Sequence, residues 1–269
     1  MIDLAPSHKR GLALRSPLLN SAGTLGFADE YAGLIDFARL GAFVTNPITA
    51  RPRTPARGEH VYEFGGGVLV HTGLPNPGIG EAIRQFARKW ARLPCPVVVH
   101  VAATTPDEVA LCVQRLEAVD NVAGIELGFR DEIGDEVAAE LIGAAQLGSL
   151  PVLARLPLIR AEELCEVAVN AGAQALVVAA PPRGTMQLLG GEWITGRLYG
   201  PAYFPLALNA VRLVANKVKI PIIGAGGVHT LADAPAMLAA GAVAVEVDSA
   251  VWRDPRVMER IAAALSADG

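Results

Sequence analysis

The residues best suited to bind a ligand are glycines that follow a short apolar run near the end of the chain. The run 221–223 reads as a strand, and Gly224, Gly226 and Gly227 follow where the chain must turn sharply into a helix. A second apolar run, 243–247, comes after that helix, so the stretch is a complete parallel crossover. In a (β/α)8 barrel, two consecutive turns of this kind bind a phosphate with free backbone amides. The sequence therefore predicts a phosphate site in the C-terminal quarter.

Two charged residues end neighbouring predicted strands in the middle of the chain. Glu126 lies near the end of strand 122–127 and Arg155 near the end of strand 151–156. Strand alternation directs both side chains toward the mouth of a barrel. They could form an acid–base pair or an anion clamp, and a structural ion pair inside the barrel is the favoured interpretation.

Four further titratable residues each allow a chemical and a structural interpretation. Asp131 could act as a general base, or could be a solvated loop carboxylate. His100 lies inside the run PVVVHV, where a hydrogen-bonded core histidine is the simpler interpretation. His71 lies in a long loop and could line a pocket, whereas His229 follows the glycine turn, where surface exposure is expected.

The elements that must position these residues alternate regularly between strands and helices. The predicted strands are 17–20, 41–45, 96–101, 122–127, 151–156, 175–179, 221–223 and 243–247. The predicted helices are 31–40, 80–93, 106–119, 133–147, 161–171, 203–218, one capped by Thr230 or Asp233, and 255–266. Eight such units predict an α/β fold, a (β/α)8 TIM barrel, with a doubly wound sheet as the alternative.

Two connections are too long to be simple links. Residues 46–77 and 181–201 each follow a predicted strand and are rich in Gly, Pro and Arg. Long loops that come only after strands favour the barrel over the doubly wound sheet. We expect the first of them to lie over one barrel mouth.

The composition narrows the class of protein. A chain of 269 residues with 52% hydrophobic and only 5% aromatic residues suits one domain, 1–269, with a core of aliphatic parallel strands. A net charge of −4 argues against a nucleic-acid surface. The absence of a long apolar run argues against a membrane span, so we expect a cytoplasmic protein. Cys95, Cys112 and Cys165 have no metal-binding spacing, so no metal site is predicted.

Several short pieces of sequence occur together in an order typical of one known family. They are 20–24 (NSAGT), 44–45 with 48–49, 73–74 with 76–78, the glycines and prolines of 196–205, and 224–228. Over nearly its whole length the chain resembles the dihydroorotate dehydrogenase family, whose members are FMN-dependent barrel enzymes. The resemblance also suggests a homodimer.

The resemblance implies which residues would bind FMN and a small-molecule substrate. The cofactor-binding positions would be Ser21, Ala22, Asn46, Arg155, Gly200, Gly226, Gly227 and Ser249. His71 and Asn76 would contact the substrate. Asp131 stands where the family has its cysteine base, and Arg155 stands where a lysine neutralises the N1 region of the flavin, so these two are the catalytic candidates.

The chain departs from the family at positions that matter for chemistry. Asn46 replaces a lysine, and Val70, Gly128 and Ala180 replace substrate-binding asparagines. Asp248 stands where the family has a glycine facing the phosphate. A carboxylate about 4–5 Å from a phosphate costs roughly 3–4 kcal/mol per charge pair at an effective dielectric constant near 20.

A nearby cation could offset this repulsion at Asp248. Arg197 or Arg183 could pair with Asp248 or with the phosphate, or an Asp248–Arg197 pair could replace the ligand altogether.

Three functions remain open at this point. The leading hypothesis is a divergent FMN-dependent oxidoreductase that acts on a small molecule other than dihydroorotate, or acts only poorly on dihydroorotate. The alternative is a non-catalytic barrel that binds a ligand or a protein partner. A phosphate-ester lyase or isomerase is least favoured, because no lysine ends a predicted strand to form a Schiff base.

Overall fold

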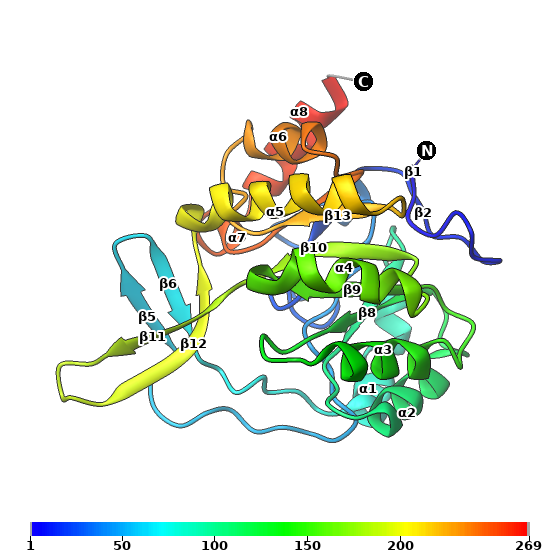
Figure 1. The fold of residues 1–269 in the computed structure, drawn as a ribbon, viewed down its shortest axis with the longest axis horizontal. Helices are drawn as coiled ribbons and strands as arrows, with labels where there is room; N and C mark the ends of the chain where they lie inside the picture. Colours follow the sequence, from blue (N-terminus) through cyan, green and yellow to red (C-terminus); the bar gives the residue numbers. More distant parts are fainter. Residues whose placement is uncertain (1, 268–269) are drawn as a thin grey trace.

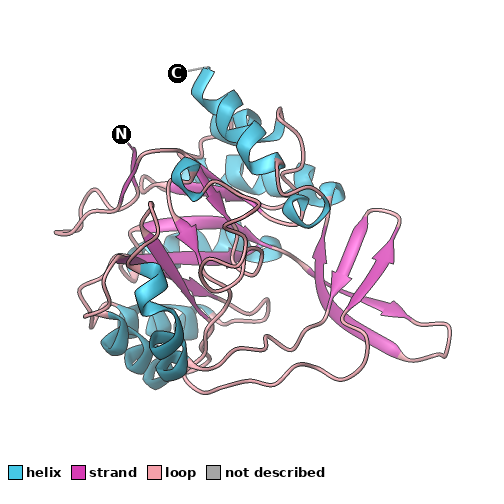
Figure 2. Ribbon diagram, turned by 180° about the vertical axis from the view of Figure 1, so that it is seen from behind, coloured by secondary structure: helices cyan, strands magenta, loops and turns pink. Residues whose placement is uncertain are grey.

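In the computed structural model, which describes residues 2–267, parallel strands form a nearly closed barrel surrounded by helices (Figures 1 and 2). Within these residues the barrel has eight strands, in the order β3-β14-β13-β10-β9-β8-β7-β4. Their bounds are β3 Leu18–Asn20, β4 Phe43–Val44, β7 Val97–Val101, β8 Val122–Gly128, β9 Val152–Pro157, β10 Ala175–Ala180, β13 Ile222–Ala225 and β14 Ala244–Val247. A parallel bridge between Leu19 and Ala42 brings the two outer strands together. The predicted (β/α)8 barrel is confirmed.

The helices cover the outside of this barrel. Their bounds are α1 Ile79–Trp90, α2 Pro106–Leu116, α3 Asp135–Ala145, α4 Ala161–Asn170, α5 Phe204–Lys217, α6 Asp233–Ala239, α7 Ala250–Arg253 and α8 Val257–Ala267, with 3-10 turns η1 Phe37–Arg39, η2 Leu158–Arg160 and η3 Pro201–Tyr203. Local sequence sets their starts: Thr105 caps α2 by accepting from the Glu108 amide, and Pro106 occupies the first turn. None of the helices among the described residues is both long enough and apolar enough to cross a membrane.

The predicted helix 31–40 is wrong. Residues 31–35 form turns and a bend, and η1 is all that remains of a helix there. Asp36 has extended backbone and accepts a hydrogen bond from the Ala38 amide, so it caps a short turn where a helix would have to continue. The barrel ring therefore has no α-helix between β3 and β4.

Each of the two long connections contains strands. They form hairpins, β5 Val61–Phe64 with β6 Gly67–Val70, and β11 Arg183–Gln187 with β12 Trp193–Tyr199. Pairing of β6 with β12 joins the hairpins into one antiparallel sheet, β11-β12-β6-β5, which projects to one side of the barrel (Figure 1). The close pairing requires a glycine, since a Cβ on Gly196 would lie 2.4 Å from the Val70 carbonyl oxygen. We call this sheet the arm.

Apolar side chains pack in two layers. The larger one lies between the helices and the outside of the strands. The smaller one includes strand residues such as Leu19 and Val177 together with Leu4, Leu12 and Leu14, which come from the β1–β2 segment (β1 Ile2–Asp3, β2 Ala13–Leu14). The polar residues of the site lie at the carboxyl ends of the same strands.

Candidate functional site

A buried arginine links three strands near their carboxyl ends. Arg155 on β9 donates from Nη1 to Glu126 Oε1 on β8 at 3.2 Å and to Glu246 Oε2 on β14 at 2.5 Å. Its Nη2 donates to Ser21 Oγ, just after β3, at 2.6 Å. All four residues are at least 96% buried. The predicted Glu126–Arg155 ion pair is therefore present, as one part of a larger cluster.

The charges of this cluster balance when one carboxyl group holds a proton. Burial raises the pKa of Glu246 to about 8. The charge of Arg155 opposes this rise, and the nearby Glu126 charge adds to it. Burial and the Arg155 charge lower the pKa of His100 to about 3. A neutral His100, with Nδ1 2.6 Å from Glu126 Oε1, is the core histidine that the sequence indicates.

The glycine turn after β13 faces a carboxylate of the chain itself. Gly226 and Gly227 have φ of 110° and 69°, conformations that favour glycine. The Gly227 amide donates to Asp248 Oδ2 at 3.2 Å, and the Ser249 amide donates to Asp248 Oδ1 at 2.5 Å. Asp248 is 2% exposed, so its carboxylate occupies the turn that the sequence predicts for a phosphate.

His229 lies beside this carboxylate. Its Nε2 is 3.1 Å from Ser249 Oγ and 4.0 Å from Asp248 Oδ1. The side chain is 18% exposed, so the expected surface position is wrong. Asp233 Oδ2 accepts from the backbone amides of His229 and Thr230, which orders the backbone just before α6. Burial lowers the pKa of His229 and raises the pKa of Asp248.

Very little space remains between the glycine turn and the arm. A cavity of about 10 Å³ lies there, room for about one water molecule. Its lining includes Gly200, Gly226, Gly227, Asp248, Leu198 and Ala225. Tyr199 of β12 packs edge-on against Trp252 with ring centroids 5.0 Å apart. Burial raises the pKa of its phenol, against the effect of the nearby Arg155.

An ion pair joins the arm to the loop after β8. Arg197 Nη1 donates to both oxygens of Asp131 at 2.8 Å and to the Pro181 carbonyl at 2.7 Å. Asp131 is 7% exposed, so its interpretation as a solvated carboxylate is wrong. The proposed Asp248–Arg197 pair is also not formed, because Arg197 reaches Asp131.

The other residues that the sequence analysis assigned to cofactor or substrate binding are Asn76, Asn46, His71 and Ala22. Asn76 serves its own loop: its Oδ1 accepts from the amides of Thr49 and Gly78. Asn46 Oδ1 is buried and has no hydrogen-bond partner among the described residues. His71 is half-buried, with its backbone amide donating to His60. Ala22 follows Ser21 directly at the end of β3.

Sequence reasoning missed Glu246 and Tyr199. A single charge inside the apolar run AVEV was the available signal for Glu246, since a buried strand admits a carboxylate only when it is paired. Tyr199 gave no such signal, because its position depends on the arm.

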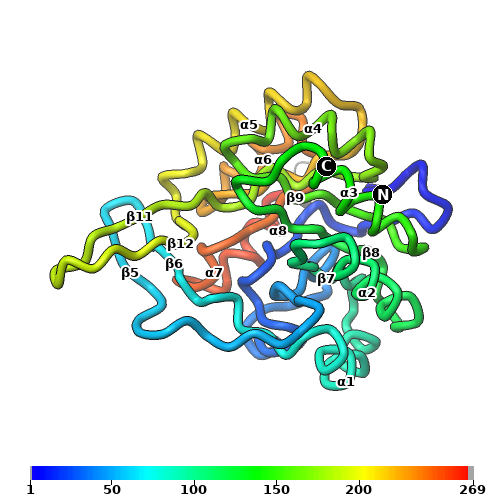
Figure 3. Tube along the Cα trace, turned by 60° about the horizontal axis from the view of Figure 1, so that its bottom comes forward, coloured from blue at the N-terminus to red at the C-terminus, as the bar shows by residue number. Residues whose placement is uncertain are grey.

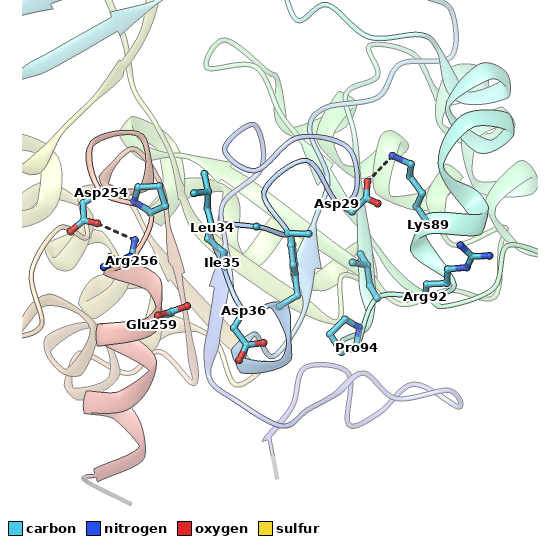
Figure 4. A pocket seen from close by; sticks show the side chains of 15 residues that line it. Asp29, Leu34, Ile35, Asp36, Lys89, Arg92, Pro94, Asp254, Arg256 and Glu259 are labelled. Atoms are coloured by element: carbon cyan, nitrogen blue, oxygen red, sulfur yellow. Dashed lines mark hydrogen bonds and ion pairs between the residues drawn. The ribbon is translucent and has the colours of Figure 1, made fainter.

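A second hollow of about 900 Å³ lies on the outside of the barrel, where the expected helix 31–40 is missing (Figure 4). It lies between the 29–37 segment, the end of α1 and the start of α8. Lys89 pairs with Asp29 at one end of it, at 2.6 Å (Figure 4). It shares no lining residue with the small cavity, so it is a separate surface feature. Within residues 2–267 no group of three or more His, Cys, Asp or Glu side chains could hold a metal ion.

The chain is similar to known proteins over nearly its full length. The sequence model of the family described as dihydroorotate dehydrogenase matches residues 7–129 and 136–268. A relative from Desulforudis audaxviator, named "Dihydroorotate dehydrogenase B (NAD(+)), catalytic subunit", is 34% identical across 95% of this chain and 89% of its own. A relative of the same name from Pelobacter propionicus is 31% identical across 94% and 89%.

A solved structure has the same fold. The crystal structure of DHODH in complex with ferulenol, from Eimeria tenella, superposes with a TM-score of 0.75 at 16% identity, covering 94% of this chain and 83% of that one.

Proposed function

The chain belongs to the dihydroorotate dehydrogenase family. We propose that it nevertheless uses the family's barrel to bind a protein partner and not to carry out FMN-dependent oxidation. Its (β/α)8 fold is that of the family's flavin oxidoreductases. The proposal rests on how its own side chains fill the place where a flavin would be bound.

The observation that carries the proposal is the 10 Å³ cavity at the strand ends. Pockets that bind cofactors and other small molecules enclose roughly 300–1,000 Å³. The 900 Å³ hollow is lined by none of the residues that the family resemblance assigns to FMN. The small cavity is lined by three of the eight positions assigned to FMN, Gly200, Gly226 and Gly227, so the chain leaves no room for a flavin phosphate beside them in this structure.

The groups implied to face the flavin are already engaged. Arg155, expected near the flavin N1, is bound by two carboxyl groups and Ser21. The family match breaks between residues 129 and 136, around Asp131, which is paired with Arg197. Both catalytic candidates thus make internal ion pairs, which supports a structural role for them.

The arm supplies a surface suited to a protein partner. Its outer strands β5 and β11 each have an unpaired edge, and edges of this kind invite pairing with another chain. Large apolar side chains are exposed on it: Val61 is 49% exposed, and Trp193 is 67% exposed. Aromatic residues are enriched at protein interfaces. A second copy of the chain is one partner that would fit this surface, in line with the homodimer suggested by the family.

Absorption spectroscopy of the purified protein tests the proposal. We expect no flavin bands near 370 and 450 nm, roughly where flavins absorb, after adding FMN and dialysing. Flavin bands that survive dialysis would overturn it. Light scattering of wild type and of Trp193→Ser then tests the arm, since loss of a solution complex in the variant supports an interface there.

An FMN-dependent oxidoreductase acting on a small molecule other than dihydroorotate is the second candidate. The positive φ angles of Gly226 and Gly227 favour it, because these turns keep the backbone form that would bind a phosphate. Retained flavin in wild type, followed by flavin reduction on adding a substrate, would select this candidate over the first.

A further inference from the structure

The carboxylate of Asp248 makes the contacts that a bound anion would make. Its Oδ2 accepts from the Gly227 amide at 3.2 Å, and its Oδ1 accepts from the Ser249 amide at 2.5 Å and the Ser249 hydroxyl at 3.1 Å. Backbone amides and a hydroxyl converging on one negative group are the donors of an anion-binding turn.

The turn is shaped for this contact. Gly227 has φ of 69°, and a Cβ on it would lie 2.5 Å from the Phe204 nitrogen, so another residue would displace the turn. That backbone directs the Gly227 amide at Asp248. The sequence thus keeps a glycine turn suited to a ligand and places its own acid in it.

The titratable side chain beside this carboxylate is a histidine, whose pKa burial lowers. His229 Nε2 is 4.0 Å from Asp248 Oδ1, and no arginine or lysine makes an ion pair with Asp248 among the described residues. His229 also lies 3.1 Å from Ser249 Oγ, within reach of any anion held by that hydroxyl. The site has therefore kept the backbone and hydroxyl donors together with a titratable imidazole that can donate from Nε2.

We propose that Asp248 is a built-in anion that blocks a phosphate site formed by Gly227, Ser249 and His229. This inference rests on the proposed function, in which no flavin phosphate fills the turn. Removal of the carboxylate leaves the donors unpaired and adds its volume to the neighbouring 10 Å³ cavity, which Asp248 lines. An inorganic phosphate or a phosphate monoester can then take its place.

Titration of Asp248→Gly with inorganic phosphate tests the inference. We expect saturable binding by calorimetry, with amide chemical shifts of Gly227 and Ser249 moving together. Wild type and Asp248→Asn, which keeps the side-chain volume, should bind at least tenfold more weakly. Adding His229→Gln to Asp248→Gly should weaken phosphate binding several-fold while the amide shifts stay at the same two residues.

Two outcomes would overturn it. One is a folded Asp248→Gly variant, checked by circular dichroism, that binds phosphate no better than wild type. If that variant does not fold, the same titration of Asp248→Ser decides. The other is saturable phosphate binding by Asp248→Gly that leaves the amide shifts of Gly227 and Ser249 unchanged, since the phosphate would then bind elsewhere. Flavin retained by wild type would instead contradict the proposed function, so the two failures are distinguishable.

Discussion

Arg155 Nη1 lies 2.5 Å from Glu246 Oε2, so an ion pair joins β9 to β14 across the inside of the barrel. These strands are not neighbours in the barrel, since β10 and β13 lie between them. The pair therefore braces the barrel across its interior, in addition to the hydrogen bonds between adjacent strands.

Removing the guanidinium should destabilise the protein strongly. Arg155→Met leaves Glu126 and Glu246 without their cation, and breaking a buried pair in this way costs about 3–5 kcal/mol. Urea unfolding measures the loss. Arg155→Met combined with Glu126→Gln and Glu246→Gln should recover part of it. Arg212→Met, on the outside of α5, is the control and should change stability by less than about 0.5 kcal/mol. Equal stability of the Arg155 and Arg212 variants would contradict the brace.

The proton on Glu246 should make stability depend on pH. Its folded pKa of about 8 lies above the ordinary value of 4.5, so the native state binds more protons between these values. Unfolding free energy should therefore fall by a few kcal/mol as pH rises from about 4.5 to 8. Glu246→Gln should flatten this slope in urea titrations at several pH values. Glu140→Gln on the exposed face of α3 should retain it, and an unchanged slope in Glu246→Gln would refute the assignment.

The neutral state of His100 should act in the opposite direction. Its folded pKa of about 3 lies below the ordinary 6.5, so the unfolded state binds more protons between these values. Stability should fall as pH drops from 6.5 toward 3. Unfolding of His100→Gln, followed from pH 7 to pH 4, should show a weaker fall than wild type. If the unfolding free energy of His100→Gln fell as steeply as that of wild type, a group other than His100 would take up the proton.

The Asp131–Arg197 contact should hold the arm to the barrel. A double-mutant cycle with Asp131→Asn and Arg197→Gln should give a coupling energy of about 1–3 kcal/mol, because both oxygens of a buried carboxylate accept from one guanidinium. Both single variants should also speed hydrogen exchange in β12. Additive effects within about 0.3 kcal/mol would show that the two side chains are independent.

The turn at Gly227 should not accept a side chain. Gly227→Ala adds a Cβ 2.5 Å from a backbone atom at a positive φ, which should cost about 1–3 kcal/mol. Gly190→Ala, where a Cβ meets nothing within 4 Å, is the matched control. Thermal unfolding of both variants checks this, and equal melting temperatures would contradict it.

The barrel was predictable because each of its units is encoded locally. Apolar runs such as 96–101 and 122–127 are bounded by turns, and the helices between them have an apolar face. The order of the strands and helices can therefore be predicted from short stretches of sequence. The failed helix 31–40 shows the limit of this reasoning. Its apolar spacing is helical, but Asp36 caps a shorter turn.

The arm and the filled site could not be predicted, because both depend on contacts between distant segments. Val70 and Arg197 are directly paired in the arm, and neither local sequence indicates that pairing. The partners of Asp131 follow from the arm and so were missed with it. Asp248 was identified as an obstacle to a phosphate, but its hydrogen bonds with the glycine turn depend on the three-dimensional arrangement.

The pairing of β6 with β12 also sets an order of events during synthesis. β6 leaves the ribosome long before β12, with β7 to β10 between them, and an isolated hairpin is only marginally stable. The edge of β6 therefore stays open while most of the barrel is being made, a period in which such an edge is prone to pair with other chains. We expect arm amides to gain protection from hydrogen exchange after barrel amides during refolding.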